Sequence, residues 1–171
     1  MAAQLPRLRE ARFAELTPYE VYGLCRLRVD VFVVEQECPY PELDGRDVEP
    51  ATVHLWYERD GAAAPEILAT IRVLDDGAEK VIGRVATAAG ARGQGLAAAL
   101  IRRGIELCAG APIHLGAQAY LEGWYERFGF RKSGPGYIED GIPHVPMRRP
   151  GDDEATEQAD AAAEGEPPVS G

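Results

Sequence analysis

The sequence lacks the features that mark membrane, nucleic-acid and metal-binding proteins. Its 171 residues contain no apolar run of the roughly 18 residues that a membrane-spanning helix needs. The first ten residues have no apolar core of a secretory signal, and no cluster of Lys and Arg suggests a nucleic-acid surface. The three histidines, His54, His114 and His144, have no metal-ligand spacing. We therefore expect no membrane, nucleic acid or metal among the partners.

Cysteine is scarce and is not arranged for disulfides. Cys25, Cys38 and Cys108 are odd in number and form no CxxC pair. This usage fits a reducing compartment, so we expect a cytoplasmic protein. Cys25 and Cys108 fall in helical apolar patterns, which is typical of small core residues.

Basic residues are missing from the last 21 positions. Residues 151–171 hold seven of the 28 acidic residues and no Lys or Arg, which leaves 21 acidic and 18 basic residues elsewhere. The net charge of −10 therefore belongs mostly to this segment. The segment also lacks aromatic residues, Leu and Ile, and so cannot bury enough surface to offset its ordering entropy. We expect one folded domain over residues 1–150 and an acidic disordered tail over 151–171.

Hydrophobic periodicity predicts an α+β domain. Thr17-Pro18 with Glu20 is a helix start of the capping-box type, and helical spacing continues toward Val34. Alternating apolar residues and turn signals predict a meander of strands over 52–58, 66–74 and 81–87. A helix over 93–108, a strand over 112–118, a short helix over 121–128 and strands beginning at 130 and 144 follow. The strand after the long helix should run parallel to the strand before it.

A glycine-rich turn connects the third meander strand to the long helix. Arg92-Gly93-Gln94-Gly95-Leu96-Ala97 places the free N–H groups of a first helical turn at the sheet edge, which favours a bound phosphate. The Gly-Lys-Ser/Thr ending of a Walker A loop is absent. Ala98 completes a formal dinucleotide pattern, but that pattern belongs to the first βαβ unit of a parallel sheet, and this turn follows a meander. A purely structural turn is the remaining alternative.

Two motifs in order resemble the GCN5-related N-acetyltransferase (GNAT) family. Arg92, Gly95 and Ala97 fit the family's Q/R-x-x-G-x-G/A, and Tyr125 to Phe130 resembles its Y-x-x-x-G-F, with Gln118 where many members have Asn. The resemblance covers about residues 12–149. Runs such as Val31-Phe32-Val33-Val34-Glu35-Gln36 and Asp140-Gly141-Ile142-Pro143-His144 look like its ElaA-like branch. This implies a mixed, mostly antiparallel sheet with a splayed parallel pair of strands and flanking helices.

The resemblance also implies a site for acetyl-CoA as the acyl donor. Its pantetheine arm would enter the splayed pair, and the N–H near Val85 would face the thioester oxygen. Tyr125 matches the family's general acid; a core aromatic is the alternative. The implied donor-binding residues are Val85, Ala86, Thr87, Arg92, Gly93, Gln94, Gly95, Leu96, Ala97 and Gln118.

The general base matters more than the acid. An alkyl amine has a pKa near 10.4, so its neutral form costs roughly 4–5 kcal/mol at pH 7, whereas a thiolate with a pKa of about 8.5 leaves more easily. Glu35 follows an apolar run, where partial burial would raise its pKa toward the useful range. The alternatives are an ion pair of Glu35 with Arg28 or Arg72, and, as the base, Asp44, Asp47, His144 or a water chain.

The sequence thus predicts an N-acetyltransferase that joins acetyl-CoA and an amine in a ternary complex. No cysteine lies in the motifs, so no covalent acyl-enzyme is expected. The acceptor is a small-molecule or peptide amine, and the chain acts as a monomer or homodimer. Acidic residues from Glu35 to Asp47 suggest a cationic acceptor, although such loops are usually just solvated. A non-catalytic acyl-CoA sensor and an acyl-homoserine-lactone-synthase relative, suggested by Arg28-x-x-x-Phe32, remain as alternatives.

Overall fold

One sheet of eight strands organises the protein, and it opens like a fork in its middle. The computed structural model describes residues 5–164. The strand order is β1-β2-β3-β4-β5-β8-β6, with β7 paired to β8. The strands are β1 Arg7–Arg12, β2 Val53–Arg59, β3 Glu66–Asp76, β4 Glu79–Thr87, β5 Ile113–Gln118, β6 Arg131–Lys132, β7 Tyr137–Glu139 and β8 Ile142–Arg149.

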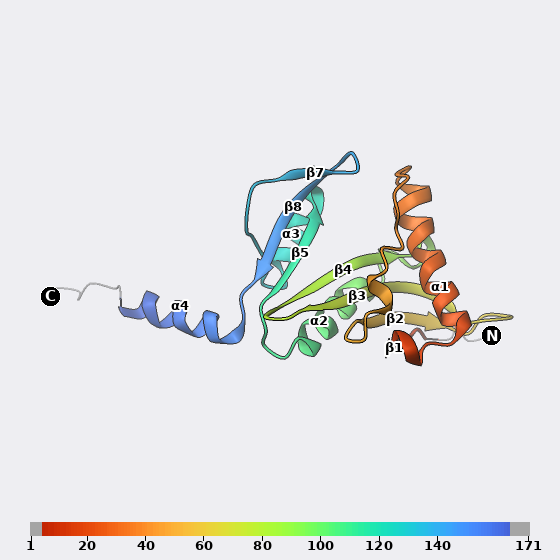
Figure 1. Ribbon diagram of the computed structural model, residues 1–171, viewed down its shortest axis with the longest axis horizontal. Coiled ribbons are helices and arrows are strands. Elements are labelled where there is room, and N and C mark those ends of the chain that lie inside the picture. The colour runs from red at the N-terminus through yellow and green to blue at the C-terminus, as the bar shows by residue number, and fades with distance from the viewer. Residues whose placement is uncertain (1–4, 165–171) are drawn as a thin grey trace.

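The fork lies between β4 and β5, the one parallel pair among the described strands. These strands pair only at Lys80 with Ile113 and at Val81 with His114, near the start of each strand. Beyond Val81, β4 pairs with β3 alone, while β5 pairs with β8. Figure 1 shows β5 and β8 leaving the direction of β2, β3 and β4 from this point. The predicted splayed parallel pair is confirmed.

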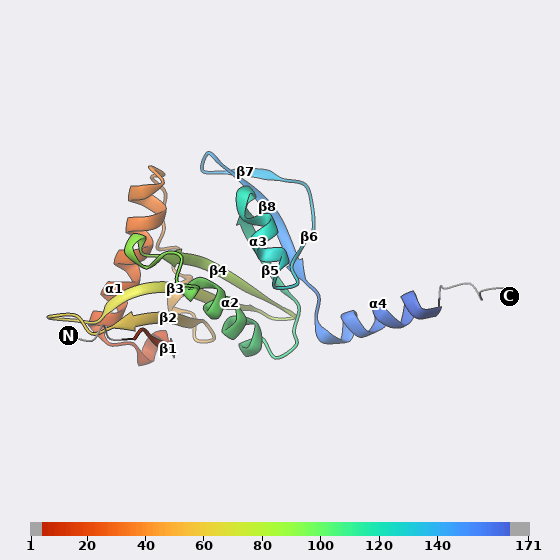
Figure 2. The same ribbon diagram turned by 180° about the vertical axis from the view of Figure 1, so that it is seen from behind.

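Two long helices cover opposite faces of the sheet. They are α1 Pro18–Val29 and α2 Leu96–Leu107. The other helices are the short α3 Glu122–Glu126 and α4 Asp152–Glu164, which follows β8. Figures 1 and 2 show α1 in front of the sheet in one view and α2 in front in the other. Leu100 and Ile101 of α2 are buried against Leu55 and Ile71, and Leu24 of α1 is buried in a second cluster.

The helix starts that the sequence predicts form as expected. Thr17 is the N-cap of α1: its hydroxyl accepts the N–H of Glu20, and the Glu20 carboxylate accepts the N–H of Thr17. The helix predicted to reach Val34 changes character after Val29, because residues Asp30–Glu35 form a π-helical turn, η2. Such wider turns often occur at functional sites. Here the turn carries Phe32 and Glu35 to the fork.

The short 3₁₀ turns are η1 Phe13–Glu15, η3 Arg46–Val48, η4 Ala89–Ala91 and η5 Ala119–Leu121. The sequence pattern does not predict two of the strands, β1 and β7. The strand β1 lies at the edge of the sheet and most of its residues are exposed, so it lacks the alternating apolar pattern by which strands are recognised. β7 has three residues and is joined to β8 through Asp140 and Gly141, both with positive φ, as a tight hairpin turn requires.

The acidic tail differs from the expected disorder over residues 152–164, which form α4. Three acidic residues in its first turn complement the helix dipole, and Ala, Glu and Gln are good helix formers. Arg148 donates to both carboxylate oxygens of Glu154, at 2.7 and 2.9 Å, and ties the helix to β8. The remainder of the tail, 165–171, lies outside the described residues, and the boundary at 150 stays a prediction.

Candidate active site

A cleft of about 980 Å³ fills the fork between β4 and β5. Its walls come from η2, β4, the glycine turn, β5, α3 and the β7–β8 hairpin. The cleft exists because the parallel pair separates after Val81, which leaves one backbone edge of β4 without a neighbouring strand. An extended ligand can therefore lie along β4 in the way that a strand would.

Most of the predicted donor-binding residues line this cleft. Val85, Ala86, Thr87, Arg92, Gly93, Ala97 and Gln118 all do so. Both Gly93 and Gly95 have positive φ, at +77° and +76°, and a Cβ at either would meet nothing within 4 Å. The turn is thus an open backbone cradle at the start of α2, where unpaired N–H groups and the helix dipole favour an anion.

Three predicted residues do not line the cleft. Leu96 is buried in the core on the first turn of α2. Gln94 is exposed and donates to the carbonyl of Gly90 at 3.4 Å. Gly95 caps the helix and does not line the cleft. These three residues can therefore serve a ligand only through their backbone.

Glu35 is placed differently from the expectation. Its side chain is 47% exposed and accepts a hydrogen bond from Nη2 of Arg92 at 2.7 Å. That hydrogen bond holds the Glu35 pKa below its ordinary value. The expected upward shift is wrong, because the carboxylate is neither buried nor unpaired. The expected partners Arg28 and Arg72 bind other carboxylates.

Tyr125 lies in the cleft, as the motif implies. Its ring is buried, 5% exposed, and packs edge-on against Trp124 and Phe130 of the main core. No hydrogen bond of its hydroxyl occurs within the described part of the chain, and that oxygen is not enclosed. Burial raises the pKa of Tyr125, so the phenol stays protonated and can donate.

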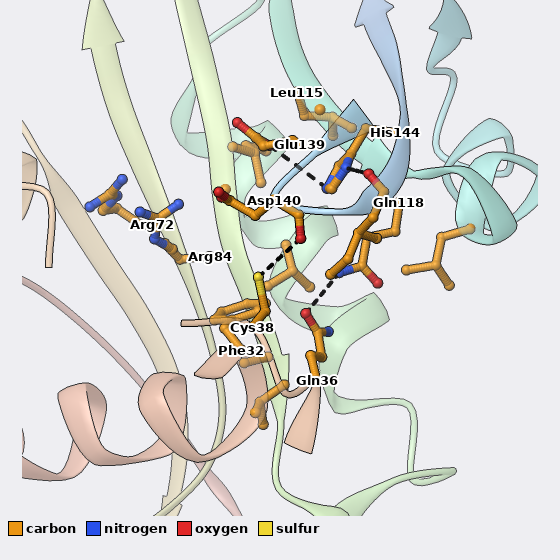
Figure 3. A pocket seen from close by; sticks show the side chains of 18 of the residues that line it. Phe32, Gln36, Cys38, Arg72, Arg84, Leu115, Gln118, Glu139, Asp140 and His144 are labelled. Carbon is orange, nitrogen blue, oxygen red and sulfur yellow. Dashed lines mark hydrogen bonds and ion pairs between the residues drawn. The ribbon is translucent and has the colours of Figure 1, made fainter. Parts of the chain in front are cut away.

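Two hydrogen bonds join the walls of the cleft. Gln118 of β5 donates to the side-chain oxygen of Gln36 at 3.2 Å, and the Cys38 thiol donates to the Asp140 carbonyl at 3.3 Å. Figure 3 shows both contacts between the segment after η2 and the far wall. They hold α1 and its following loop against β5 and the β7–β8 hairpin.

The acidic loop residues are neutralised by buried arginines. Arg28 donates to Glu42 at 2.5 Å and forks onto Asp47 at 2.6 and 3.1 Å. Arg72 forks onto Asp44 at 2.8 and 2.7 Å. The Arg72 hydrogen bonds lower the Asp44 pKa, whereas burial of Asp47 acts to raise its pKa and is outweighed by Arg28. The loop is therefore a structural ion cluster, so its acidity does not indicate a cationic acceptor, and Asp44 and Asp47 are poor bases.

Arg84 is a cleft residue that the sequence pattern did not reveal. The β3–β4 pairing slips between Thr70 and Arg72, and Arg84 takes the left-handed backbone at φ +54°. Such a bulge redirects one side chain of a strand, here into the cleft above Tyr40. An Arg in the left-handed region is uncommon, so the fold holds this conformation at an energetic cost. The Arg in the middle of an apolar strand is the one signal that the sequence offers.

His144 lies on the far wall, paired with Gln118 in the β5–β8 register. Its Nδ1 donates to the carbonyl of Ile142 at 2.8 Å, which leaves Nε2 as the acceptor of the neutral ring. Nε2 lies 3.8 Å from a carboxylate oxygen of Glu139, and the ring stacks on Tyr137.

Within residues 5–164, no three His, Cys, Asp or Glu side chains gather as metal ligands, and no helix is long and apolar enough to cross a membrane.

Comparisons with known proteins match this geometry. A family model described as an acetyltransferase (GNAT) domain matches residues 30–150. The "UPF0039 protein Rv2851c" of Mycobacterium tuberculosis is 46% identical over 84% of this chain and 93% of its own length. "Protein ElaA" of Escherichia coli is 38% identical over 82% of this chain and 94% of its own length.

Solved structures agree with the sequence relatives. An acyl-CoA N-acyltransferase from Pseudomonas aeruginosa superposes with a TM-score of 0.79 at 42% identity, over 85% of this chain and 99% of that one. The structure of Escherichia coli ElaA gives a TM-score of 0.77 at 36% identity, with the same shares covered. The family model, the sequence relatives and the solved structures all point to the same family, and the forked sheet and the glycine turn before α2 are consistent with it. The chain therefore belongs to the GNAT acetyltransferase family, in its ElaA-like branch.

Proposed function

We propose that this chain is an N-acetyltransferase that uses acetyl-CoA as the acyl donor and an amine as the acceptor. The observation that carries the proposal is the open cradle of Gly93 and Gly95 beside the unpaired edge of β4. A pyrophosphate fits the cradle, and pantetheine amides fit the backbone of Val85 to Thr87 as a neighbouring strand would. When bound, acetyl-CoA supplies a thioester carbonyl that an amine can attack.

The residues around the fork suit direct transfer in a ternary complex. The N–H of Val85 would donate to the oxygen that becomes negative during attack, and the Tyr125 hydroxyl would donate a proton to the departing sulfur. Cys38 lines the cleft, but its thiol donates to the Asp140 carbonyl, and Cys108 is buried in the core beside α2. No residue of this constellation is a thiol nucleophile, so attack needs proximity and oriented donors rather than an acyl-enzyme.

We propose His144, in place of Glu35, as the residue that receives the amine proton. Its Nε2 is an acceptor in a wall of the cleft, and Glu139 at 3.8 Å would stabilise the charged ring after proton uptake. Glu35 is a weaker base because Arg92 holds its pKa down. Glu35 would instead compete with the pyrophosphate for the Arg92 guanidinium.

Replacing Tyr125 with phenylalanine tests the acid. We expect kcat to fall about ten- to thirtyfold at pH 7, the cost of expelling an unprotonated thiolate with a pKa near 8.5. The KM for acetyl-CoA should stay nearly constant, because the ring keeps its packing against Trp124 and Phe130. Thiol release from acetyl-CoA with a panel of amines gives both constants. Tyr120→Phe is the matched control, since Tyr120 also lines the cleft but is 78% exposed. An unchanged kcat in Tyr125→Phe would make Tyr125 a core residue.

Replacing Glu35 with glutamine tests the competition for Arg92. The change frees Arg92, so we expect coenzyme A to bind up to about fivefold more tightly at low salt, the range of one exposed ion pair. The gain should shrink at high salt because screening weakens the Glu35–Arg92 pair in the parent protein. Titration calorimetry measures the affinity, with Glu157→Gln, an exposed acid on α4, as the control for net charge. Weaker binding in Glu35→Gln would contradict the competition.

The sensor alternative makes a different prediction. A non-catalytic sensor would bind acetyl-CoA without releasing thiol in the presence of any amine. Thiol release that depends on an amine therefore supports the enzyme, and saturable binding without release across the panel overturns it.

A further inference from the structure

Two walls of opposite character face each other in the half of the cleft that holds Arg84. Arg72 and Arg84 form one wall from β3 and β4, and Glu139, Asp140 and His144 form the other from the β7–β8 hairpin. Figure 3 shows the two arginines on one side and the hairpin residues on the other, with Cys38 below them. We call this space the acceptor chamber.

Some N–H groups of the two arginines make no hydrogen bond within the described residues. Nη2 of Arg84 donates to the Glu42 carbonyl and to Asp44, both at 3.1 Å. Nη1 of Arg84 donates to no described residue and is not enclosed, and the side chain lines the cleft, so we treat this N–H as the donor available to a ligand. Nε of Arg84 lies 2.9 Å from a Glu42 oxygen but at an angle that makes no hydrogen bond.

Arg72 adds a second, more deeply buried cation to the same wall. It is 4% exposed, and its Nε has no hydrogen-bond partner among residues 5–164. This Nε is enclosed, so no ligand can accept from it, but the buried cation lines the cleft and attracts an anion brought near the wall. The arginines are also held rigidly, because Asp44 accepts from both of them. A preorganised guanidinium pair suits a planar, two-oxygen anion such as a carboxylate.

The two walls of the chamber carry charges of opposite sign. Arg28, Arg72 and Arg84 balance Glu42, Asp44 and Asp47, so the ion cluster of the arginine wall is neutral, whereas Glu139 and Asp140 make the hairpin wall acidic. A lone anion would meet the acidic hairpin wall, and a diamine would bring a second cation to the arginines. A molecule with one amine and one carboxylate suits both walls.

The hairpin wall suits the amine. Nε2 of His144 can accept a hydrogen bond, and the Glu139 carboxylate lies beside it, 60% exposed. The side chain of Asp140 has no ion-pair partner among the described residues, although its carbonyl accepts the Cys38 thiol. An amine at this wall would lie next to the group that we propose as the base, so binding and deprotonation would use the same residues.

We propose that the acceptor is an amino acid in the broad sense, a primary amine that carries a carboxylate on the same molecule. The carboxylate lies on Arg84 and Arg72, and the amine points to His144 and Glu139. This inference rests on the proposed function for the identity of the reaction, but the binding preference can be measured without turnover.

The test compares two series of probes that differ only in the carboxylate. The first series is glycine, β-alanine, γ-aminobutyrate, 5-aminovalerate and 6-aminohexanoate, and the second is the alkylamine of matching length for each. Binding to the protein saturated with coenzyme A is measured by calorimetry, and transfer by thiol release from acetyl-CoA. For at least one pair, we expect the affinity or the kcat/KM of the amino acid to be about tenfold or more above that of the matching alkylamine. One charge-assisted hydrogen bond to the carboxylate accounts for a ratio of that order.

Arg84→Gln supplies the decisive variant. It should reduce the ratio of kcat/KM, or of affinity, between amino acid and alkylamine about tenfold or more, and Arg84→Lys should restore part of it. The matched control is Arg46→Gln, because Arg46 also lines the cleft but donates to Glu49 and Asp76. The control should keep the ratio of the parent protein. Thermal unfolding confirms that each variant is folded.

The two proposals fail in different ways. Thiol release from neither series, while coenzyme A still binds, would overturn the proposed function, and carboxylate-selective binding would then still support the chamber. Alkylamines that bind and react as well as the amino acids at every length would overturn the chamber and leave the transferase intact. An equal effect of Arg84→Gln and Arg46→Gln on the ratio would also overturn it.

Discussion

Replacing Gly95 with glutamate is expected to lower the affinity for acetyl-CoA about a hundredfold while the protein stays folded. Gly95 has φ +76° and caps α2, and a Cβ there projects into open space in the ligand-free protein. A pyrophosphate bound in the cradle would occupy that space, so the glutamate side chain would clash with it. The new carboxylate would also repel the negative charge of the pyrophosphate. The loss of two charge-assisted hydrogen bonds amounts to about 3 kcal/mol, which is about a hundredfold in Kd.

The chain offers a matched control for backbone strain. Gly77 has φ +82° and equally open surroundings, but it lies in the turn between β3 and β4 and not in the glycine turn before α2. Gly77→Glu therefore carries the same left-handed penalty, about 1–2 kcal/mol, and the same charge. Both variants should lose a similar amount of thermal stability, and only Gly95→Glu should lose binding. Calorimetry with coenzyme A measures this, and unchanged affinity in Gly95→Glu would remove the glycine turn from the donor site.

Replacing Arg28 with leucine is expected to reduce the free energy of unfolding by about 3–5 kcal/mol, the usual result of deleting one partner from a buried ion pair. Arg28 is 2% exposed and holds two carboxylates, Glu42 and Asp47, which would be left without their nearest cation. Glu42 also accepts the Tyr40 hydroxyl at 2.5 Å. The loss of Arg28 should therefore loosen the wall of the acceptor chamber as well as the fold.

The stability lost in Arg28→Leu should depend on pH in a definite direction. In the parent protein the Asp47 pKa is below its ordinary value of 3.8, so its stabilising effect is complete above that value and is lost as the pH falls through the lowered folded-state pKa. In Arg28→Leu, Asp47 keeps Arg72 at 3.0 Å but loses its nearer cation, so its carboxylate favours the protonated form more than in the parent protein. The stability difference between the two proteins should therefore be largest near neutral pH and shrink in acid. Denaturant unfolding at several pH values measures it.

The control is Arg26→Leu on the same helix. The Arg26 side chain is 68% exposed and contacts only Asp30, one turn later, at 3.6 Å among the described residues. We expect a change of less than about 0.5 kcal/mol, typical of a surface pair. Equal effects at positions 26 and 28 would show that the cluster around Arg28 contributes nothing beyond an ordinary helix surface.

The fold was largely predictable because its signals are local. Thr17 and Glu20 mark the start of α1 within four residues, and Gly93 and Gly95 stand where only glycine readily takes the backbone that begins α2. Alternating apolar residues place β2, β3 and β4, and the parallel β4–β5 pair follows from the helix between them. The π-helical turn and β7 escaped prediction because neither has a distinct period in the sequence.

The site was predictable only where a motif is continuous in the chain. The donor side depends on Val85 to Ala97, one uninterrupted segment whose backbone geometry the glycines determine. By itself, the sequence therefore determined the order of elements apart from β1, β7 and α4, the glycine cradle and the position of Tyr125.

The tertiary structure alone decided how the charges pair. Glu35 meets Arg92 across 57 positions, Arg72 meets Asp44 across 28, and Arg28 meets Asp47 across 19. No periodicity encodes such partners, because ion pairs form wherever folding brings opposite charges together after burial has fixed the backbone. That pairing turned Glu35 from an expected base into a partner of Arg92, neutralised the acidic loop and left Arg84 in the cleft with an N–H group that donates to no described residue.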